Sequence, residues 1–573
     1  MYKHYFILIF VFATNIAVLP AQTPPRFTIL ITELFPDPTP SIELPASEFI
    51  ELKNTSSNTI SLRNWKISDG TTTGVIANNF LLQPDSFVII CASATANLFV
   101  PFGTTIGISG FPSLNNEADI ITLYSPEGYI IHSVNYTNNW YQNDLKAAGG
   151  WTLEMIDTKN PCGANTNWKA SINDKGGTPG NKNSIDGINK DEQPPALIRS
   201  YTIDSITIVA IFNEAIDSTS GAAISNYQLN NPDYKIQYAK PIAPLFTEVQ
   251  LRLTVAMKVF TEYSLTVKNI TDCTGNSIGI FNATKTGLPV AADSMDIVLN
   301  ELLFNPPPDG NDYIEFYNRS KSIIDCKQLY IGTKSSIGNI SNSKQLTTTS
   351  FLIFPGEYLL VTENKKWLQQ YYNVKAPMQI IEMDALPPLP DDQGNISLLN
   401  FRGEIIDALF YNHQWHFALI TNKEGVALER INYQQPTQLK TNWTSAASTS
   451  GFGTPTFQNS QFGIEERITS QVNISPKIFS PDNDGVDDFL TIQCQPNEPG
   501  YVATIRIFDA AGRKVRLLTA NSTLSTTTVF RWDGLNDQLH QLPTGMYIIL
   551  TEIFNLSGKT KQFKNVVTLA KRF

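Results

Sequence analysis

The sequence predicts an all-β protein made of several β-sandwich domains in tandem. Short runs of β-branched and aromatic residues, separated by Asn, Asp, Gly and Pro, recur along its 573 residues, and helical periodicity is almost absent. The best helix candidate is one short segment at 365–372. A chain of this length exceeds one hydrophobic core, so we expect about three to five domains.

The clearest predicted strands are short alternating or continuous apolar runs. They are "DIITLYS" (119–125), "YIIHSVNY" (129–136), "SITIVAIF" (205–212), "EYSLTVKNI" (262–270), "NISLLN" (395–400) and "EIIDALFY" (404–411). Turn residues at regular intervals between such runs are typical of a sandwich.

An internal repeat divides the chain. "ITELFPDP" at 31–38 returns as "LNELLFNP" at 299–306, and "EFIELKNTS" at 48–56 returns as "DYIEFYNRS". Further matches follow in the same order, through "WTLEMID" and "VALERIN" to "GGTPGNKNS" and "GFGTPTFQNS". Matches that keep their order predict two copies of one domain.

The first residues have the pattern of a secretory signal peptide at 1–21. Lys3 precedes an apolar stretch from Tyr5 to Val18, and the small residue Ala21 ends the segment. The stretch is too short for a membrane span, and no later stretch is long enough. We therefore expect an exported chain with no transmembrane segment after signal cleavage.

Both copies resemble the lamin-tail domain, an immunoglobulin-like sandwich of nuclear lamins and of many secreted bacterial proteins. In the first copy the resemblance rests on "ITELFPDP", "EFIEL", "ISLRNWKISDG", "GWTLEMID" and "GGTPGNKNS". The second copy departs from it, because Leu329 and Tyr330 replace the strand of Trp65 and "TPTFQNS" lacks the Gly of "TPG". The resemblance implies tandem immunoglobulin-like β-sandwich domains.

Two further segments resemble known domains. The middle one resembles the bacterial immunoglobulin-like domains of surface-layer proteins, through "AIFNEAID", "NYQL", "YSLTV" and "ITDCTGNSI". The last one resembles the C-terminal sorting domains of type IX secretion and gliding motility in Bacteroidetes, through "FSPDNDGVDDF", "IRIFDAAGRKV", "FRWDGLND" and "LPTGMYII". This implies the type IX secretion machinery as a partner, and secretion or display on the outer membrane surface of a Gram-negative bacterium. The expected domains are 22–185 and 296–460 (lamin-tail-like), 191–290 (immunoglobulin-like) and 470–573 (sorting).

The charge composition argues against a nucleic-acid-binding function. Lys plus Arg number 42 and Asp plus Glu number 52, giving a net charge of −10. A surface that tracks phosphates needs clustered cations, and the densest cluster is Arg513, Lys514 and Arg516, so no nucleic-acid partner is expected.

Five cysteines are too few for a disulfide framework, although an exported chain can form some bridges. We predict a disulfide between Cys91 and Cys162, then one between Cys273 and Cys326, with Cys494 unpaired. The absence of CxxC spacing argues against a structural zinc site.

Recurring glutamates raise the question of catalysis. Glu33 and Glu51 of the first copy align with Glu301 and Glu315 of the second. Glu48 and Glu51 are an odd number of residues apart, so in a strand they point to opposite faces. A repeated glutamate can be a catalytic acid or base, but more often it accepts backbone N–H bonds in a buried turn, which we favour. Glu33 and Glu51 facing one open cleft would favour catalysis.

An aspartate-rich loop is the candidate metal site. "PDNDGVDD" contains Asp482, Asp484, Asp487 and Asp488, and alternating carboxylates around a glycine can bind Ca²⁺. The alternative is a turn that the same side chains stabilise through bonds to the backbone. No other cofactor is expected.

Aromatic residues at corresponding loop positions are candidate binding residues. Trp140 and Tyr141 lie in "NNWYQND", and Trp415 lies in "YNHQWHF". Exposed rings on sandwich loops can stack on sugars or bind proteins, whereas core packing is the interpretation we favour for most of these aromatics. If the chain has a binding surface, we expect it at these loops. The pair His413 and His416 is predicted on opposite faces of a strand, with no nearby Cys or Asp to complete a metal set.

Four β modules account for the mature sequence, and no motif of a known catalytic site is visible. We therefore expect a noncatalytic, exported, modular protein of the cell surface that attaches to or binds an extracellular polymer, glycan or protein. The alternative is a secreted hydrolase, of nuclease or esterase type, with its site in a lamin-tail-like copy around Glu33 and Glu51.

Overall fold

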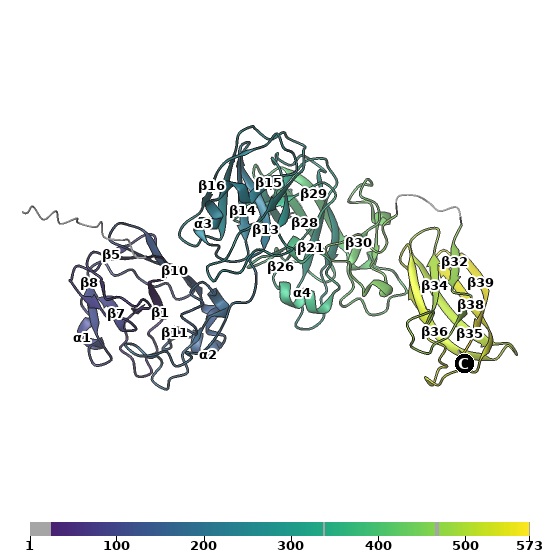
Figure 1. Ribbon diagram of the computed structural model, residues 1–573. Helices are drawn as coiled ribbons and strands as arrows, with labels where there is room; N and C mark the ends of the chain where they lie inside the picture. The colour runs from purple at the N-terminus through teal and green to yellow at the C-terminus, as the bar shows by residue number, and fades with distance from the viewer. Residues whose placement is uncertain (1–24, 336–337, 464–468, 572–573) are drawn as a thin grey trace, which may run out of the picture. The chain divides into compact units, whose positions relative to one another are not determined.

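The computed structural model describes residues 25–335, 338–463 and 469–571, so the predicted signal peptide lies outside the described residues. Strands dominate these ranges, and the all-β tandem-sandwich prediction is confirmed (Figure 1). The α-helices are α1 Ala96–Phe99, α2 Asp144–Ala147, α3 Ser218–Ala222 and α4 Lys365–Tyr371. α4 confirms the helix expected at 365–372. The 3₁₀ turns are η1 Asn138–Tyr141, η2 Ala164–Thr166, η3 Ile224–Asn226, η4 Cys326–Gln328, η5 Pro377–Gln379, η6 His413–Trp415, η7 Lys440–Asn442 and η8 Ser448–Ser450.

The chain divides into two compact units, each described by itself. The first contains the chain up to Arg199, Thr207–Val255 and Ser264–Thr284, and the second contains Ser200–Ile206, Ala256–Tyr263 and the chain from Lys285 onward.

Described residues up to 185, here called the first sandwich, form two main sheets. The six-stranded sheet has the order β12 Trp168–Ala170, β11 Leu153–Met155, β1 Ile29–Phe35, β2 Phe49–Asn54, β7 Phe87–Ala92 and β8 Thr105–Ile108. The facing sheet has the order β10 Ile130–Thr137, β9 Ala118–Tyr124, β4 Lys66–Ser68 and β5 Thr73–Val75. A small pair joins β3 Ile60–Ser61 to β6 Leu81–Leu82.

The six-stranded sheet of the first sandwich is buried on both faces. All seven residues of β1 are buried. Along β2, Ile50 and Leu52 point into the main core, which also contains Trp65, while Phe49 packs in a second cluster on the opposite face. Two buried faces explain why these strands read as nearly continuous apolar runs.

Residues 296–460, here called the second sandwich, repeat this strand order. Their six-stranded sheet has the order β31 Trp443–Ser445, β30 Leu428–Arg430, β20 Ile297–Leu303, β21 Tyr313–Asn318, β26 Tyr358–Thr362 and β27 Ile380–Glu382. The facing sheet has the order β29 Ile405–Asn412, β28 Gln393–Asn400, β23 Leu329–Lys334 and β24 Ile340–Gln345, and a small pair joins β22 Ile324–Asp325 to β25 Leu352–Ile353. In both six-stranded sheets the last pair, β7 with β8 and β26 with β27, is parallel.

Between the sandwiches, the predicted middle domain forms two small sheets. One has the order β13 Leu197–Asp204, β14 Thr207–Phe212, β17 Glu248–Leu253 and β16 Ile236–Pro241. The other has the order β15 Tyr227–Leu229, β18 Tyr263–Val267 and β19 Ala283–Thr286. The strands predicted within 205–212 and 262–270 are therefore confirmed.

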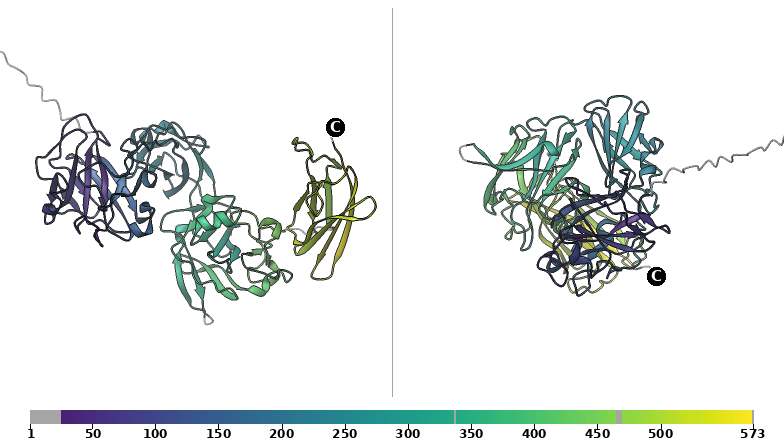
Figure 2. Two further views of the ribbon diagram at one scale, coloured as in Figure 1. Left: turned by 90° about the horizontal axis from the view of Figure 1, so that it is seen from below. Right: turned by 90° about the vertical axis from the view of Figure 1, so that its left-hand side faces the viewer.

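The C-terminal region packs a three-stranded sheet against a five-stranded one (Figure 2, yellow). The first has the order β32 Gln471–Ser475, β34 Leu490–Gln495 and β37 Thr528–Trp532. The second has the order β33 Ile478–Phe479, β39 Thr560–Leu569, β38 Gly545–Asn555, β35 Tyr501–Asp509 and β36 Lys514–Thr523. Trp532 is buried in their core beside Phe479 and Tyr547.

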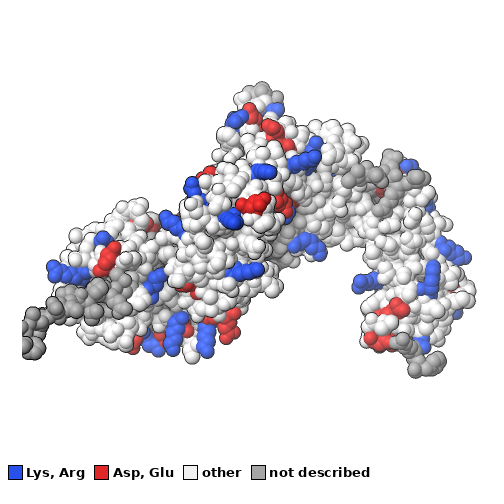
Figure 3. All heavy atoms as spheres, turned by 45° about the horizontal axis from the view of Figure 1, so that its top comes forward, with Lys and Arg blue, Asp and Glu red and all other residues white. Residues whose placement is uncertain are grey.

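Among the described residues, no helix has the length and apolar character needed to cross a membrane. On the face drawn in Figure 3, Lys and Arg side chains are scattered among Asp, Glu and neutral residues.

Candidate functional site

Three glutamates form a row across adjacent strands of the first sandwich. Glu33 in β1 lies opposite Glu51 in β2 on one side and opposite Glu154 in β11 on the other. Cross-strand partners project from the same face of a sheet, so the three carboxylates lie side by side. All three residues are 0% exposed. We call them the first carboxylate row.

The segment that follows β12 covers the first carboxylate row. The Thr178 N–H donates to Glu33 Oε1 (2.8 Å), and the Thr178 hydroxyl donates to Glu154 Oε1 (2.9 Å). The Gly180 N–H donates to Glu51 Oε2 (2.7 Å). The "GGTPG" motif at 176–180, whose counterpart in the second copy is "GFGTPT", is therefore a strap that hydrogen-bonds to the row and closes it from solvent.

The second sandwich contains the same device. Glu301 in β20 lies opposite Glu315 in β21 and Glu429 in β30, and all three are 0% exposed. The Thr454 hydroxyl donates to Glu301 Oε2 (2.6 Å) and to Glu429 Oε1 (2.8 Å), as alternatives for its one proton. The Thr456 N–H donates to Glu315. Glu301, Glu315 and Glu429 are the second carboxylate row.

Burial and mutual repulsion shift the acidity of both rows. Burial, followed by repulsion from Glu51, raises the pKa of Glu33 well above its usual range, and Glu33 Oε2 has no hydrogen-bond partner. Burial raises the pKa of Glu51 to about 8. In the second row, burial and then repulsion from Glu301 raise the pKa of Glu429 to about 8. Each row therefore retains protons near neutral pH.

This geometry bears on the hydrolase alternative. A catalytic carboxylate must reach its substrate, whereas Glu33 and Glu51 are covered by the strap and accept its hydrogen bonds. Both side chains are 0% exposed. Glu48 is half-buried and accepts the Leu114 N–H (3.2 Å).

Beside each carboxylate row, the strand contains a β-bulge that leaves one buried backbone N–H group in need of a hydrogen-bond acceptor. In the first sandwich the Ile31 N–H donates to His132 Nδ1 (2.9 Å), and the other ring nitrogen of His132 bonds to the Pro161 carbonyl oxygen (3.0 Å). Burial lowers the pKa of His132 to about 4. His132 is therefore a neutral imidazole, protonated on Nε2, that supports the fold.

The predicted calcium loop is largely exposed to solvent, and three of its four aspartates lie close together. Asp482, Asp484 and Asp488 each offer an oxygen within 4.8 Å of the others, whereas Asp487 is not in this group. The carboxylate of Asp488 also accepts the Asn483 N–H (2.6 Å). The structure thus combines both predicted features, clustered carboxylates and a turn held by side chain to backbone bonds.

The aromatic loop residues are not exposed rings. Trp140 is 7% exposed and packs against Trp168 at a centroid distance of 6.1 Å. Tyr141 is 3% exposed, and its hydroxyl donates to the Trp151 carbonyl oxygen (3.1 Å). Trp415 is half-buried against the core of the second sandwich. The burial of Trp140 and Tyr141 in η1 favours core packing, the interpretation preferred from the sequence, over an exposed stacking surface.

The predicted Cys91–Cys162 disulfide is wrong. Cys162 bonds instead to Cys273, with a Cα–Cα distance of 6.5 Å that lies in the usual range. Cys91 is buried in β7 among phenylalanine side chains, away from both. The predicted Cys273–Cys326 bond is therefore wrong as well. Cys494 is a buried free thiol, so the prediction of an unpaired Cys494 is confirmed.

The histidine pair lies in a different setting from the one predicted. η6 contains His413 and precedes His416, so the two are not on a strand. Both line a cavity of about 220 Å³ that sequence reasoning missed. Its other lining residues are Phe304, Asn305, Asp391, Asp392 and Lys423.

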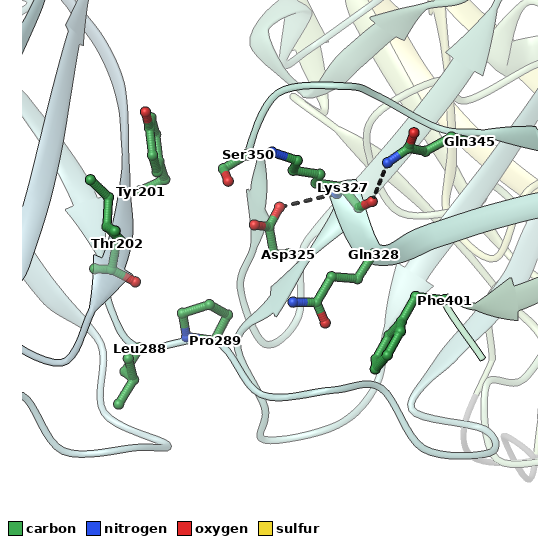
Figure 4. A pocket seen from close by; sticks show the side chains of 11 residues that line it. Tyr201, Thr202, Leu288, Pro289, Asp325, Lys327, Gln328, Gln345, Ser350 and Phe401 are labelled. Carbon is green, nitrogen blue, oxygen red and sulfur yellow. Dashed lines mark hydrogen bonds between the residues drawn. The ribbon is translucent and has the colours of Figure 1, made fainter.

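A larger open cavity of about 760 Å³ lies in the second unit (Figure 4). Asp325 accepts the Lys327 N–H (3.0 Å), and the Gln345 amide donates to the Lys327 carbonyl oxygen (2.7 Å). Asp325 also accepts the Phe351 N–H (3.0 Å). These polar groups bond to the protein itself and therefore do not define a ligand.

Two domain families match the chain. A model of the Lamin Tail Domain matches residues 22–138, and a model of the CHU_C Type IX secretion signal domain matches residues 473–569. The chain carries a lamin tail domain and a type IX secretion signal domain. The signal domain indicates export to the cell surface or the extracellular space in Bacteroidetes, and recognition by the secretion machinery.

Other comparisons are distant. No curated protein matches the chain. Among solved structures, the N-terminal part of the bacterial S-layer protein SbsC is 13% identical over 29% of this chain and 40% of that chain, with a TM-score of 0.16. Yersinia pseudotuberculosis InvD is 12% identical over 66% and 97%, with a TM-score of 0.14. A DUF4876 family protein from Bacteroides thetaiotaomicron is 10% identical over 44% and 90%, with a TM-score of 0.16. These values support no functional inference.

Proposed function

We propose that this chain is a noncatalytic modular protein of the cell surface that attaches to or binds an extracellular glycan, other polymer or protein. The observation that supports this most is the C-terminal match to a secretion signal domain, joined to sandwiches whose buried carboxylates are closed by straps. A strap that seals the row favours a stable module over a catalytic cleft.

The proposal includes a domain order. Residues 1–21 are a signal peptide, 191–290 an immunoglobulin-like domain, and 296–460 a second lamin tail domain. Support for the second lamin tail domain comes from the strand order and the carboxylate row that it shares with the first sandwich.

Delivery is tested by removing the signal domain. Deletion of residues 470–573 is expected to trap the chain in the periplasm, while deletion of 191–290 as the control leaves export intact. Protease accessibility on whole cells measures the result. Continued surface delivery without 470–573 would reject the assignment.

Binding is tested with the full mature chain on glycan and extracellular-protein arrays. We expect at least one ligand class to bind, and the full chain with Trp532→Ala serves to show whether the signal domain takes part. An empty array would count against a binding role and leave surface structure as the function.

We also propose that the loop with Asp482, Asp484 and Asp488 binds Ca²⁺, with Asp487 beside it. Oxygen ligands clustered around Gly485 are what a hard cation prefers. Ca²⁺ should raise the melting temperature of the C-terminal region and should fail to do so in Asp488→Asn. A melting temperature indifferent to chelator would reduce the loop to a turn.

A further inference from the structure

A buried imidazole in the second sandwich has one unused nitrogen. His416 is 4% exposed, and its Nδ1 lies 2.8 Å from Ser445 Oγ. The Phe417 N–H donates to the same hydroxyl (2.9 Å). His416 Nε2 has no hydrogen-bond partner within the protein. A buried polar atom left without a partner is costly, so this nitrogen calls for a ligand.

The ring of His413, which lines the same cavity, is also bonded to an oxygen through Nδ1. Its Nδ1 lies 3.0 Å from the backbone carbonyl oxygen of Asp392. A carbonyl only accepts, so Nδ1 carries the proton and Nε2 keeps its lone pair. For His416, donation from Nδ1 to Ser445 Oγ leaves Nε2 in the same state. Metal-binding histidines are usually oriented in this way, with the other ring N–H donated to an oxygen.

Carboxylates complete the set around this cavity. Asp391 and Asp392 line the cavity of about 220 Å³ together with His413 and His416. The β28–β29 hairpin brings them there, because Gln393 pairs with Asn412 at its open end. Both aspartates are exposed, so their side chains can rotate without unpacking the core.

The first sandwich lacks the two imidazoles at the equivalent place. The His413 N–H donates to the Asp392 carbonyl oxygen (2.7 Å), just as the Asn138 N–H donates to that of Glu117 (2.7 Å). His413 thus replaces Asn138, and three residues later His416 replaces a tyrosine whose hydroxyl bonds to the backbone. The two imidazoles are therefore a property of the second sandwich alone, although both sandwiches share the same local backbone arrangement.

We propose that the second sandwich binds a divalent transition-metal ion of the zinc class through His413 Nε2, His416 Nε2 and a carboxylate of Asp391 or Asp392. Two imidazoles and a carboxylate, with water in the remaining position, suit Zn²⁺ better than Ca²⁺ or Mg²⁺. The three-ligand groups already within 4.8 Å in the described structure lie elsewhere. Binding therefore requires an aspartate side chain to turn inward.

Charges around the cavity favour a cation on balance. Lys423 Nζ donates to the His413 carbonyl oxygen (3.1 Å) and opposes a metal ion, while Asp391 and Asp392 contribute two negative charges. Burial, then Lys423 and His413, lower the pKa of His416 to about 3, so its ring is neutral at ordinary pH. Removal of the lysine charge should tighten metal binding.

The test titrates Zn²⁺ alone into the full, untagged mature chain, with a chromophoric chelator as competitor. We expect one Zn²⁺ per chain at this site and a Co²⁺ complex whose absorption reports nitrogen and oxygen ligands. His413→Asn and His416→Tyr copy the first sandwich, and each should weaken binding at least about tenfold. Lys423→Gln should strengthen it, and His540→Asn, at an exposed histidine, is the matched control.

Two results would overturn the site. Absence of bound Zn²⁺ at micromolar concentration would reject it. Unchanged affinity in His413→Asn and His416→Tyr would indicate an adventitious ion only. Because His416 is buried, Ser445→Ala provides a variant that keeps the imidazole, and it should weaken Zn²⁺ binding about 10- to 100-fold. The substitution also removes the acceptor of the Phe417 N–H, so the melting temperature of the metal-free variant is measured to show that the chain is folded under the assay conditions.

Discussion

The two sandwiches satisfy an equivalent buried backbone N–H group with different side chains. In each, a bulge in the strand beside the carboxylate row exposes an N–H that needs a buried acceptor. The first uses neutral His132 for Ile31 (2.9 Å), and the second uses Asp407 for Leu299 (2.8 Å). Asp407 in turn lies 3.5 Å from the guanidinium of Arg430, which is 0% exposed. A charged acceptor therefore comes with a buried cation.

The cation occupies the place of an apolar residue in the first sandwich. Met155 pairs with Trp168 in β12, and Arg430 pairs with Trp443 in β31. Arg430 also donates to the Leu299 carbonyl oxygen (3.0 Å). The second sandwich therefore has the charged pair Asp407 and Arg430 where the first has the neutral pair His132 and Met155. The two charges are expected to occur together, because a buried charge without a partner is strongly destabilising.

The largest expected effect on stability comes from removing Arg430, the partner of Asp407. Arg430→Met leaves Asp407 buried without its cation and should cost about 3–5 kcal/mol of unfolding free energy. Adding Asp407→His copies the first sandwich and should recover most of that loss. Denaturant unfolding measures both. A double variant no more stable than Arg430→Met would show that the positions are independent.

A smaller effect on stability is expected from removing one threonine hydroxyl from each strap. Thr454→Val removes a hydroxyl placed between two buried carboxylates and should cost about 1–3 kcal/mol. Thr178→Val removes a hydroxyl bonded to one carboxylate, Glu154, and should cost less. The free energy of unfolding of each variant provides the check, with exposed Thr71→Val as a control. The reverse order would contradict the larger contribution assigned to the Thr454 hydroxyl.

The smallest expected effect is on pH dependence. Burial raises the pKa of Glu51 and of Glu429 from 4.5 to about 8. The stability contributed by the protonated forms is therefore complete below about pH 4.5 and is lost as pH rises through about 8. These glutamates should lower the melting temperature as pH rises from about 4.5 to about 8. The fall is clearest above about pH 6.5, because burial lowers the pKa of His132 from 6.5 to about 4 and its opposing contribution is complete there.

Neutral isosteres sharpen that prediction. Glu51→Gln and Glu429→Gln together should flatten the decline on the alkaline side, since neither amide can ionise. Glu48→Gln, which changes a half-buried glutamate outside the rows, is the control. A melting temperature that rises with pH in the wild-type chain would contradict protonated rows.

Local pattern predicted the strands well, and tertiary arrangement explains what it missed. Glu33 and Glu51 stood out because they recur, but Glu154 did not, since nothing local separates a buried glutamate from an exposed one. Its alignment with Glu429 in "LEM" and "LER" was the available signal. The row itself appears only when β11 pairs with β1 far along the chain.

The predicted cysteine pairing was wrong, and the neighbours of His413 were missed, because both depend on pairing between distant parts of the chain. The partner of Cys162 lies 111 residues away, and no spacing rule selects it. The aspartates near His413 precede it by one hairpin, so pairing "NISLLN" with "EIIDALFY" in register would have placed Asp392 beside the histidine. Trp140 and Tyr141 were left between core packing and a binding surface, because aromatic content does not report burial.

The central claim is that both carboxylate rows are closed by their straps. Hydrogen exchange of the full chain at neutral pH tests it most directly, by following segments 176–185 and 451–460 against the exposed loop 480–488. The closed arrangement predicts strong protection of both straps, at a level approaching β1 and β20. Exchange of either strap as fast as the exposed loop would contradict it and would reopen the carboxylates to substrate.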